Sequence, residues 1–334
     1  MYKKRDYWPT EDWRTSTPQE QGMDAGWQPQ LMAYIGQTRP YLNAVLVIRH
    51  GYLVFEYYKE NYSRESYQIL NSATKSFTAT LIGLALRDGF LTELDQCLEE
   101  FLPDAFRHLE VHPYKRQITM RQLLKMTSGL YPDALLQYDD AEDWVRFALE
   151  SPTLCPPDQL FLYSSISSHL LSVILSHATG MSTLAYARKV LFEPLGIRTD
   201  ERAGFIWGQD PQGYYRGAGG LHLRARDVAK LGYLYLNEGL WEDTRLLPST
   251  YVQEATRKQT SGGSPEAAGY GYQWWIAELA GQRYFFASGF GGQYLQVFPD
   301  LDLILVLHAP DEPFTGAYHR QFIPLAFLLP AMNT

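Results

Sequence analysis

The stretch QILNSATKSFTATLIGLAL, residues 68–86, begins with polar residues and continues as a segment that is apolar on nearly every side. Ser72 and Lys75 stand three positions apart, so in a helix they share a face, with Cβ atoms about 5–6 Å apart. A serine hydroxyl needs a base to accept its proton, and a buried lysine with a lowered pKa can be that base. The start of a helix also offers N–H groups to a developing oxyanion. The alternative is an N-cap serine followed by a solvated lysine, and the S-x-x-K spacing alone favours this alternative.

The composition is that of a globular protein. The chain has 334 residues, 46% hydrophobic and 14% aromatic, enough for the core of one large domain or of two joined ones. Its net charge of −8 argues against a nucleic-acid partner, because phosphate binding needs a basic face. We find no apolar span of about 18 residues and no apolar segment behind the basic N-terminal residues, so neither a membrane partner nor a secretory signal is expected. Cys97 and Cys155 are expected to be free thiols in the cytoplasm.

The first half of the chain predicts one hairpin followed by helices. In residues 43–58, two β-branched and aromatic runs flank His50-Gly51, where glycine supplies the positive φ of a tight turn. The helix that starts near Ser72 is expected to end at Gly89 as a left-handed cap. A further helix is expected after Thr119, its N-cap. The helices between residue 119 and about residue 240 are expected to end at Gly129, Gly180, Pro194 and Gly239.

The last third of the chain returns to strand patterns. Residues 269–279, 283–299 and 301–309 are strand-like, Pro299-Asp300 marks a hairpin turn, and a helical pattern follows. Two early and three late strands predict one central antiparallel sheet in an α/β (α+β) fold. Residues 1–72 and 240–334 would form the sheet region and residues 73–239 an inserted, mostly helical region. The active site is expected in the cleft between them.

Two further segments carry residues that suit catalysis. Tyr163 leads into a helical pattern after the Pro-rich approach CPPDQLFLYSS. A tyrosine oxygen near a lysine ammonium can have a lowered pKa and relay protons as a general base and then a general acid. In ASGFGGQYLQVFP, the small residues before an alternating strand let a substrate approach a sheet edge, where a backbone N–H can complete an oxyanion hole.

These three segments, in this order, resemble the serine β-lactamase and penicillin-binding-protein superfamily. The likeness is strongest to its class C-type enzymes and their esterase, aminohexanoate-oligomer hydrolase and D-aminopeptidase relatives. It covers nearly the whole chain: LNSATKSFTATLIGLAL resembles the nucleophile helix, and YGYQWW and GFGGQYLQVFPDLDLILVL resemble the late strands. The resemblance implies the β-lactamase-like fold.

The resemblance also implies a role for each matching residue. Ser72 would be the acylated nucleophile, Lys75 its proton-accepting neighbour, and Tyr163 the general base and acid. The backbone N–H groups of Ser72 and Phe290 would form the oxyanion hole. The substrate would be a small ester or amide, and neither a cofactor nor a metal is implied.

The chain departs from the family pattern at two motifs. Ser165 stands where the lactamases carry the asparagine of Tyr-x-Asn, and it is shorter and lacks the amide. Ala287-Ser288-Gly289 stands where they carry Lys-Thr-Gly, so the lysine that helps to hold a substrate carboxylate is absent. Losing such a charge-assisted contact costs about 1.5–3 kcal/mol of binding. We therefore expect esters and neutral amides rather than β-lactams as substrates.

Other features leave alternatives open. Trp207 is a candidate for the substrate pocket, although any single tryptophan here can equally belong to the core or rim. His108 and His112 do not form a zinc motif. The alternative functions are an amidase or peptidase for D-amino-acid or ω-amino-acid amides, and a penicillin-binding-like module that is acylated without turnover.

Overall fold

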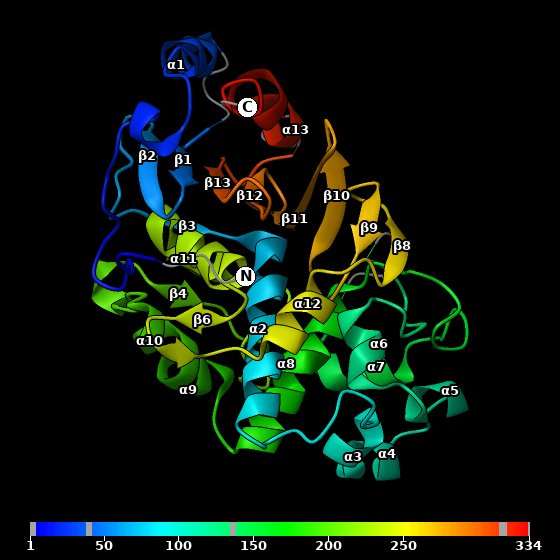
Figure 1. The fold of residues 1–334 in the computed structure, drawn as a ribbon. Helices are drawn as coiled ribbons and strands as arrows, with labels where there is room; N and C mark the ends of the chain where they lie inside the picture. Colours follow the sequence, from blue (N-terminus) through cyan, green and yellow to red (C-terminus); the bar gives the residue numbers. More distant parts are fainter. Residues whose placement is uncertain (1–4, 38–41, 134–137, 314–318, 333–334) are drawn as a thin grey trace.

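The computed structural model describes residues 5–37, 42–133, 138–313 and 319–332. Its centre is an eight-stranded sheet in the order β2-β1-β13-β12-β11-β10-β9-β8, in which all neighbouring strands run antiparallel (Figure 1). Strands from both ends of the sequence meet in this sheet, and helices lie against it. The predicted α/β (α+β) fold with a central antiparallel sheet is confirmed.

The predicted early hairpin joins the two ends of the chain. It consists of β1 (Ala44–Arg49) and β2 (Tyr52–Tyr58). His50 and Gly51 have φ values of 51° and 89°, the positive values that a tight two-residue hairpin turn requires. On its other side β1 pairs with β13 (Leu303–His308), from Ala44 opposite His308 to Arg49 opposite Leu303. Strand β1 is therefore an inner strand of the sheet.

The late part of the chain supplies six strands of this sheet rather than three. Residues 269–279 divide into two strands because Gln273, with a φ of 57°, lies in a turn between them, and residues 283–299 divide at Gly291 and Gly292, whose φ values are also positive. The Pro299-Asp300 turn is confirmed. The late strands that precede β13 are β8 (Thr260–Gly263), β9 (Ala268–Tyr270), β10 (Trp275–Leu279), β11 (Gln282–Gly289) and β12 (Gln293–Phe298).

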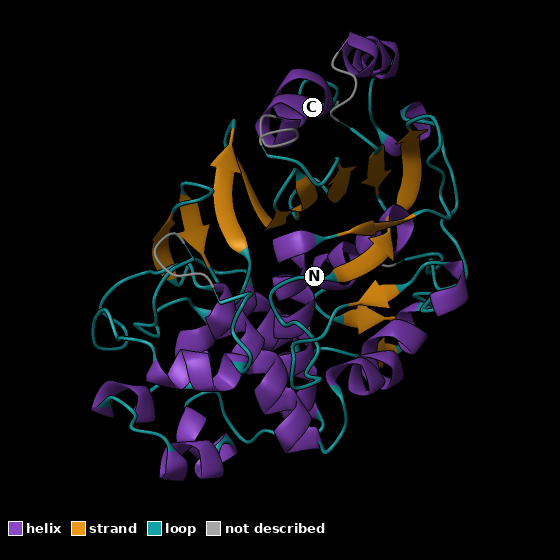
Figure 2. Cartoon of the chain, turned by 180° about the vertical axis from the view of Figure 1, so that it is seen from behind, coloured by secondary structure: helices purple, strands orange, loops and turns teal. Residues whose placement is uncertain are grey.

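The sheet is covered on both faces, which explains why its central strands are buried at successive positions. In β1, Leu46 and Ile48 belong to one hydrophobic core and Val45 and Val47 to another. The first core also contains the buried residues of α2 (Thr74–Arg87) and α11 (Ala225–Leu236). The second contains those of α1 (Trp27–Gln37), α13 (His319–Ile323) and the π-helical turn η5 (Pro324–Leu328). Figure 2 shows the helices of both layers from behind.

The section between the early and late strands of the sheet is mostly helical. It also holds a three-stranded sheet in the order β3-β5-β4, and a short β6-β7 pair follows it. Its helices after α2 are α3 (Leu98–Phe101), α4 (Pro103–His108), α5 (Pro113–Arg116), α6 (Met120–Leu124), α7 (Trp144–Glu150), α8 (Ser165–Thr179), α9 (Thr183–Ala187), the π-helical turn η3 (Arg188–Phe192) and α10 (Glu193–Leu195). The small strands are β3 (Tyr67–Ile69), β4 (Ile206–Trp207), β5 (Leu221–Arg224), β6 (Leu240–Trp241) and β7 (Thr244–Arg245), and α12 spans Ser249–Ala255.

Helix ends marked by glycine were easier to predict than the others. Gly89, Gly180 and Gly239 follow α2, α8 and α11, each with a positive φ. Thr119 is the N-cap of α6, but this helix ends at Leu124, because Met126 has a φ of 59° and cannot continue it. The helix predicted to end at Pro194 continues to Leu195 through the π-helical turn, which places the proline in the first turn of α10. Among the described helices, none alone is long and apolar enough to cross a membrane, although α8 and Thr183–Leu195, bent by 77°, pass that test as a pair.

Candidate active site

The nucleophile candidate lies at the start of a rigid helix. A short 3₁₀ turn, η2 (Asn71–Ala73), leads directly into α2, and the residues from Thr74 to Ala85 are all buried. Ser72 itself is only partly buried and lines a cavity of about 750 Å³, which we call the Ser72 cavity. Its N–H group is in the first turn, where helical N–H groups have no partner within the helix. The buried body of α2 therefore holds Ser72 at the edge of a space that can admit a small organic molecule.

Lys75 lies directly behind Ser72. Its Nζ is 2.9 Å from Ser72 Oγ, 2.9 Å from Ser165 Oγ and 3.2 Å from the carbonyl oxygen of Ala218. The side chain is buried, and burial lowers its pKa from 10.5 to about 8, against the opposing charge of Asp133. The solvated lysine of the alternative interpretation is therefore ruled out for these residues. A lysine with this pKa can lose its proton close to neutral pH, which is what a base for Ser72 needs.

Tyr163 reaches the same point from the segment before α8. Its ring stacks on Trp275, with centroids 5.6 Å apart, and Lys75 Nζ lies 4.9 Å from the ring centroid. Burial raises the pKa of the phenol above its usual value, although hydrogen bonding to Ser72 opposes the rise. The expectation of a lowered tyrosine pKa is therefore wrong, because the effect of burial outweighs that of the hydrogen bond to Ser72. Tyr163 stays protonated near neutral pH and can act as a donor.

Asp133 contacts Ser165, the residue that stands in place of the asparagine of the second motif. Ser165 Oγ, which contacts Lys75, donates a hydrogen bond of 2.5 Å to Asp133 Oδ2, and the Ser165 N–H donates one of 2.6 Å to Oδ1. Ser165 thus links the buried Lys75 to a carboxylate. Asp133 was not predicted, because a lone aspartate after a proline in a turn has no pattern that points to this contact.

The end of β11 approaches the nucleophile closely. A Cβ atom on Gly289 would lie 2.1 Å from the carbonyl oxygen of Leu70, so only glycine allows this approach. Asn71 joins the two segments, since its Nδ2 donates to the carbonyl oxygen of Phe290 at 3.1 Å. Ser288, Gly289 and Phe290 all line the Ser72 cavity.

Ala287 and Trp207 lie elsewhere. Ala287 is buried in the core and does not line the Ser72 cavity, because successive strand residues face opposite sides of the sheet. Trp207 is also buried, donates its indole N–H to the carbonyl oxygen of Arg216 at 2.9 Å, and is absent from the cavity wall. For these two residues, the structure indicates packing rather than substrate contact.

The family follows from a comparison of the whole chain. A family model described as Beta-lactamase matches residues 38–326. This chain belongs to the beta-lactamase family. The resemblance stated from the sequence is thereby confirmed.

This beta-lactamase-family chain is similar to several named proteins. The 6-aminohexanoate-dimer hydrolase of Paenarthrobacter ureafaciens is 24% identical over 306 residues, which cover 83% of this chain and 75% of the relative. A penicillin-binding protein homologue from Pyrococcus abyssi, octameric in its structure, superposes with a TM-score of 0.73 at 20% identity, over 92% of this chain and 78% of that one. EstCE1, a hydrolase with promiscuous acyltransferase activity, gives a TM-score of 0.72 at 17% identity, over 95% and 98%. The family and two of these names point to a hydrolase.

The Ser72 cavity also has a charged wall that our sequence analysis did not find. Glu266, Arg320 and Tyr294 line it, and Arg320 Nε lies 2.9 Å from Glu266 Oε2. These residues come from a hairpin loop, a C-terminal helix and a strand, so no sequence spacing links them. The wall of the Ser72 cavity thus contains an ion pair between Arg320 and Glu266.

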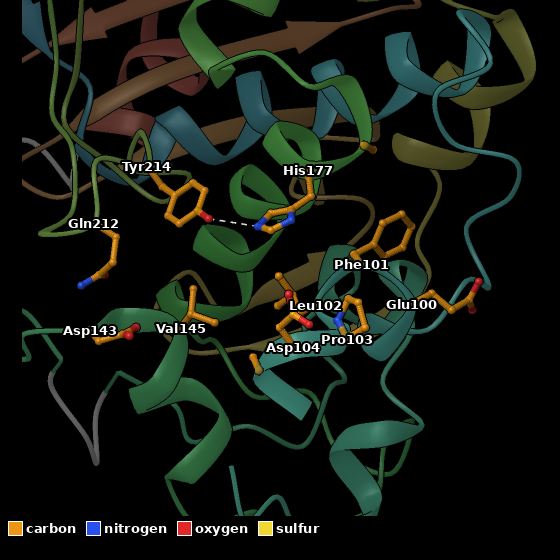
Figure 3. Close-up of a pocket in the computed structure, with 12 residues that line it drawn as sticks. Glu100, Phe101, Leu102, Pro103, Asp104, Asp143, Val145, His177, Gln212 and Tyr214 are labelled. Carbon is orange, nitrogen blue, oxygen red and sulfur yellow. Dashed lines mark hydrogen bonds between the residues drawn. The ribbon is translucent and has the colours of Figure 1, made fainter. Parts of the chain in front are cut away.

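A second cavity lies in the helical section of the chain and has a volume of about 580 Å³ (Figure 3). In it, the ring of His177 stacks on Tyr214, and Nε2 lies 3.0 Å from the tyrosine oxygen. Its wall also carries the acidic residues Glu100, Asp104 and Asp143. Ser72 and Tyr163 line the Ser72 cavity and not this one, and Lys75 contacts Ser72 from behind the cavity wall, so the predicted catalytic residues meet at the Ser72 cavity.

Proposed function

We propose that this protein is a serine hydrolase that forms an acyl-enzyme on Ser72 and cleaves small, uncharged carboxylic esters or amides. The observation that carries the proposal is the distance of 2.9 Å between Lys75 Nζ and Ser72 Oγ, with burial lowering the pKa of Lys75 to about 8. A neutral lysine at this position can accept the serine proton as the oxygen attacks.

The reaction would proceed in two halves. Ser72 Oγ bonds to the substrate carbonyl carbon while its proton moves to Lys75. The negative charge on the carbonyl oxygen is held by the backbone N–H groups of Ser72 and Phe290. The leaving alcohol or amine receives a proton through Tyr163, which burial keeps protonated. Water then attacks the acyl-enzyme, passes a proton to the same groups, and releases the acid and Ser72.

The ω-amino-acid amidase is a second candidate, favoured by one observation. The relative that is 24% identical over 306 residues is named a 6-aminohexanoate-dimer hydrolase. This activity would use the same Ser72, Lys75 and Tyr163. A comparison of 6-aminohexanoate dimer with p-nitrophenyl butyrate as substrates decides between amide and ester preference.

The first test is p-nitrophenyl butyrate hydrolysis by the wild type and by Ser72→Ala, followed from the burst phase into steady state. Steady turnover that falls by roughly a thousandfold or more in Ser72→Ala supports the proposal. Equal rates in the two proteins would contradict it. A burst of p-nitrophenol without steady turnover would instead identify an acylated module that does not hydrolyse.

A further inference from the structure

The carboxylate of Glu266 is enclosed in the wall of the Ser72 cavity. Its Oε2 lies 2.9 Å from Arg320 Nε, and the two side chains are only 11% and 8% exposed. Its Oε1 accepts a hydrogen bond from Ser288 Oγ and lies 3.4 Å from the hydroxyl of Tyr294. A carboxylate buried to this degree needs such partners, because losing its hydration water is otherwise strongly unfavourable.

The three partners of Glu266, two hydroxyl donors and one guanidinium cation, converge from different elements. Ser288 belongs to β11, Tyr294 to β12 and Arg320 to α13. Arg320 is also held without help from Glu266's carboxylate, because its Nη1 lies 2.9 Å from the hydroxyl of Tyr284 and its guanidinium lies 4.5 Å from the ring centroid of Phe286. A fixed guanidinium with two hydroxyl groups has the composition of a carboxylate-binding site.

Glu266 itself comes from outside these elements. It lies in the loop between β8 and β9, where the N–H of Ala267 donates to the carbonyl oxygen of Gly263 at 2.7 Å. The loop is therefore closed by its own backbone. The Glu266 side chain is therefore not needed to close this loop.

We propose that Ser288, Tyr294 and Arg320 form an anion-binding subsite of the Ser72 cavity, and that Glu266 fills it as a built-in carboxylate. Ser288 is two residues before Phe290 on the edge that faces Ser72, so a molecule bound here lies in the same cavity as the nucleophile. A substrate carboxylate has to displace Glu266, an intramolecular competitor at high effective concentration. Glu266 thus determines specificity by excluding anionic substrates, and its loss opens the subsite to them.

Binding tests this inference without any turnover. Monomethyl glutarate is titrated by calorimetry into Ser72→Ala protein with Glu266 intact, and into Ser72→Ala/Glu266→Ala protein. We expect the second protein to bind roughly ten- to a hundredfold more tightly, and a further Arg320→Ala substitution to remove the gain. Equal affinity in the first two proteins, or a gain that persists without Arg320, would overturn the inference.

Kinetics tests the consequence for specificity, which rests on the proposed function. Mono-p-nitrophenyl glutarate carries a carboxylate on the acyl side, 3-carboxyphenyl acetate carries one on the leaving-group side, and p-nitrophenyl pentanoate and phenyl acetate are their neutral counterparts. In Glu266→Ala, the anionic-to-neutral ratio of kcat/KM should rise at least about tenfold for one pair. Glu254→Ala, which removes the carboxylate of a solvent-exposed ion pair with Arg257, is the matched control and should leave both ratios unchanged.

The two proposals fail in different ways. Loss of Ser72-dependent turnover would contradict the hydrolase proposal and leave the calorimetric result valid. Turnover with unchanged ratios in a folded Glu266→Ala protein would contradict the inference alone. If Glu266→Ala does not fold, Glu266→Gln keeps the size of the side chain while removing its charge, and the same ratios should rise by a smaller factor. Unchanged ratios in folded Glu266→Gln would then overturn the inference.

Discussion

Two buried lysines, Lys75 and Lys115, have nearly the same pKa and very different surroundings. Burial lowers the pKa of each from 10.5 to about 8. Lys75 contacts two serine hydroxyls and one carbonyl oxygen at the wall of the Ser72 cavity. Among the described residues, Lys115 Nζ donates to carbonyl oxygens alone, those of Ala148 at 2.9 Å, Leu149 at 2.7 Å and Ser151.

The difference lies in what the neighbours can do with a proton. Hydroxyl groups can exchange protons with Lys75, and one of them borders a cavity. The carbonyl groups around Lys115 lie at the C-terminal end of α7, where a helix favours a cation and has acceptors without partners. Lys115 therefore caps the C-terminal end of α7 by donating to its carbonyl oxygens. A lowered pKa alone does not distinguish a catalytic lysine from a structural one.

Lys75→Met should give the largest effect on activity. Without the amine, Ser72 has no base, so kcat/KM for p-nitrophenyl butyrate should fall by about 10³-fold. The melting temperature should fall by only a few degrees, because Ser72 borders the cavity and Ser165 keeps its bond to Asp133, so that only the carbonyl oxygen of Ala218 loses its donor without replacement. Retention of more than a tenth of the activity would remove Lys75 from the mechanism.

Lys115→Met should show the opposite pattern. Three carbonyl oxygens lose their donor, so the free energy of unfolding in urea should fall by about 3 kcal/mol. The value of kcat/KM at 25 °C should stay within about twofold of wild type, since Lys115 is outside the Ser72 cavity. Lys125→Met, which breaks a surface ion pair with Asp158, is the control and should cost less than about 1 kcal/mol. A large loss of activity in folded Lys115→Met would contradict the purely structural role given to Lys115.

The pH dependence separates the lysines further. Lys75 accepts a proton only when it is neutral, so kcat/KM should rise about tenfold between pH 7 and pH 9, with a midpoint near its pKa of about 8. The profile should be the same in Lys115→Met. A shifted midpoint in that variant would mean that the two sites are coupled.

Asp133→Asn should give the smallest change. The negative charge of Asp133 raises the pKa of Lys75, so removing it lowers that pKa further and moves the rising limb to lower pH. At pH 7, where more of the lysine then becomes neutral, the rate should increase by about twofold. Glu254→Gln, remote from the Ser72 cavity, is the control. A limb that moves to higher pH would contradict the electrostatic role given to Asp133.

Local patterns predicted much of this molecule. Some features need only neighbouring residues and were predicted correctly: the hairpin turn at His50 and Gly51, the helix that follows Ser72, and the helix ends at Gly89, Gly180 and Gly239. The end of α6 at Leu124 was not, since nothing in the local pattern shows that Met126 adopts a positive φ. The sheet was predicted with too few strands, because short strands such as β8 and β9 have little periodicity of their own.

In the candidate site, too, contacts between neighbouring residues were easier to predict than contacts that the fold creates. Ser72 and Lys75 are three residues apart, so the sequence predicts that they share a helix face, but the burial of Lys75 that brings its Nζ to Ser72 Oγ comes from the fold. Asp133, Glu266 and Arg320 reach the Ser72 cavity through the fold, and each would pass as an ordinary surface charge in the sequence. The raised pKa of Tyr163 likewise depends on burial, which no motif encodes.

The order of strands in the sheet has a consequence for how the protein folds while it is synthesised on the ribosome. β1 is made early but needs β13, more than 250 residues later, as its neighbour. Until β13 has been synthesised, β1 presents an open edge that invites wrong pairing. The end of β11, beside Ser72, is also made late, so the nascent chain has no complete Ser72 cavity. Enzymatic activity is therefore a direct readout of finished folding, and fragments that end before β11 should be both inactive and prone to aggregate.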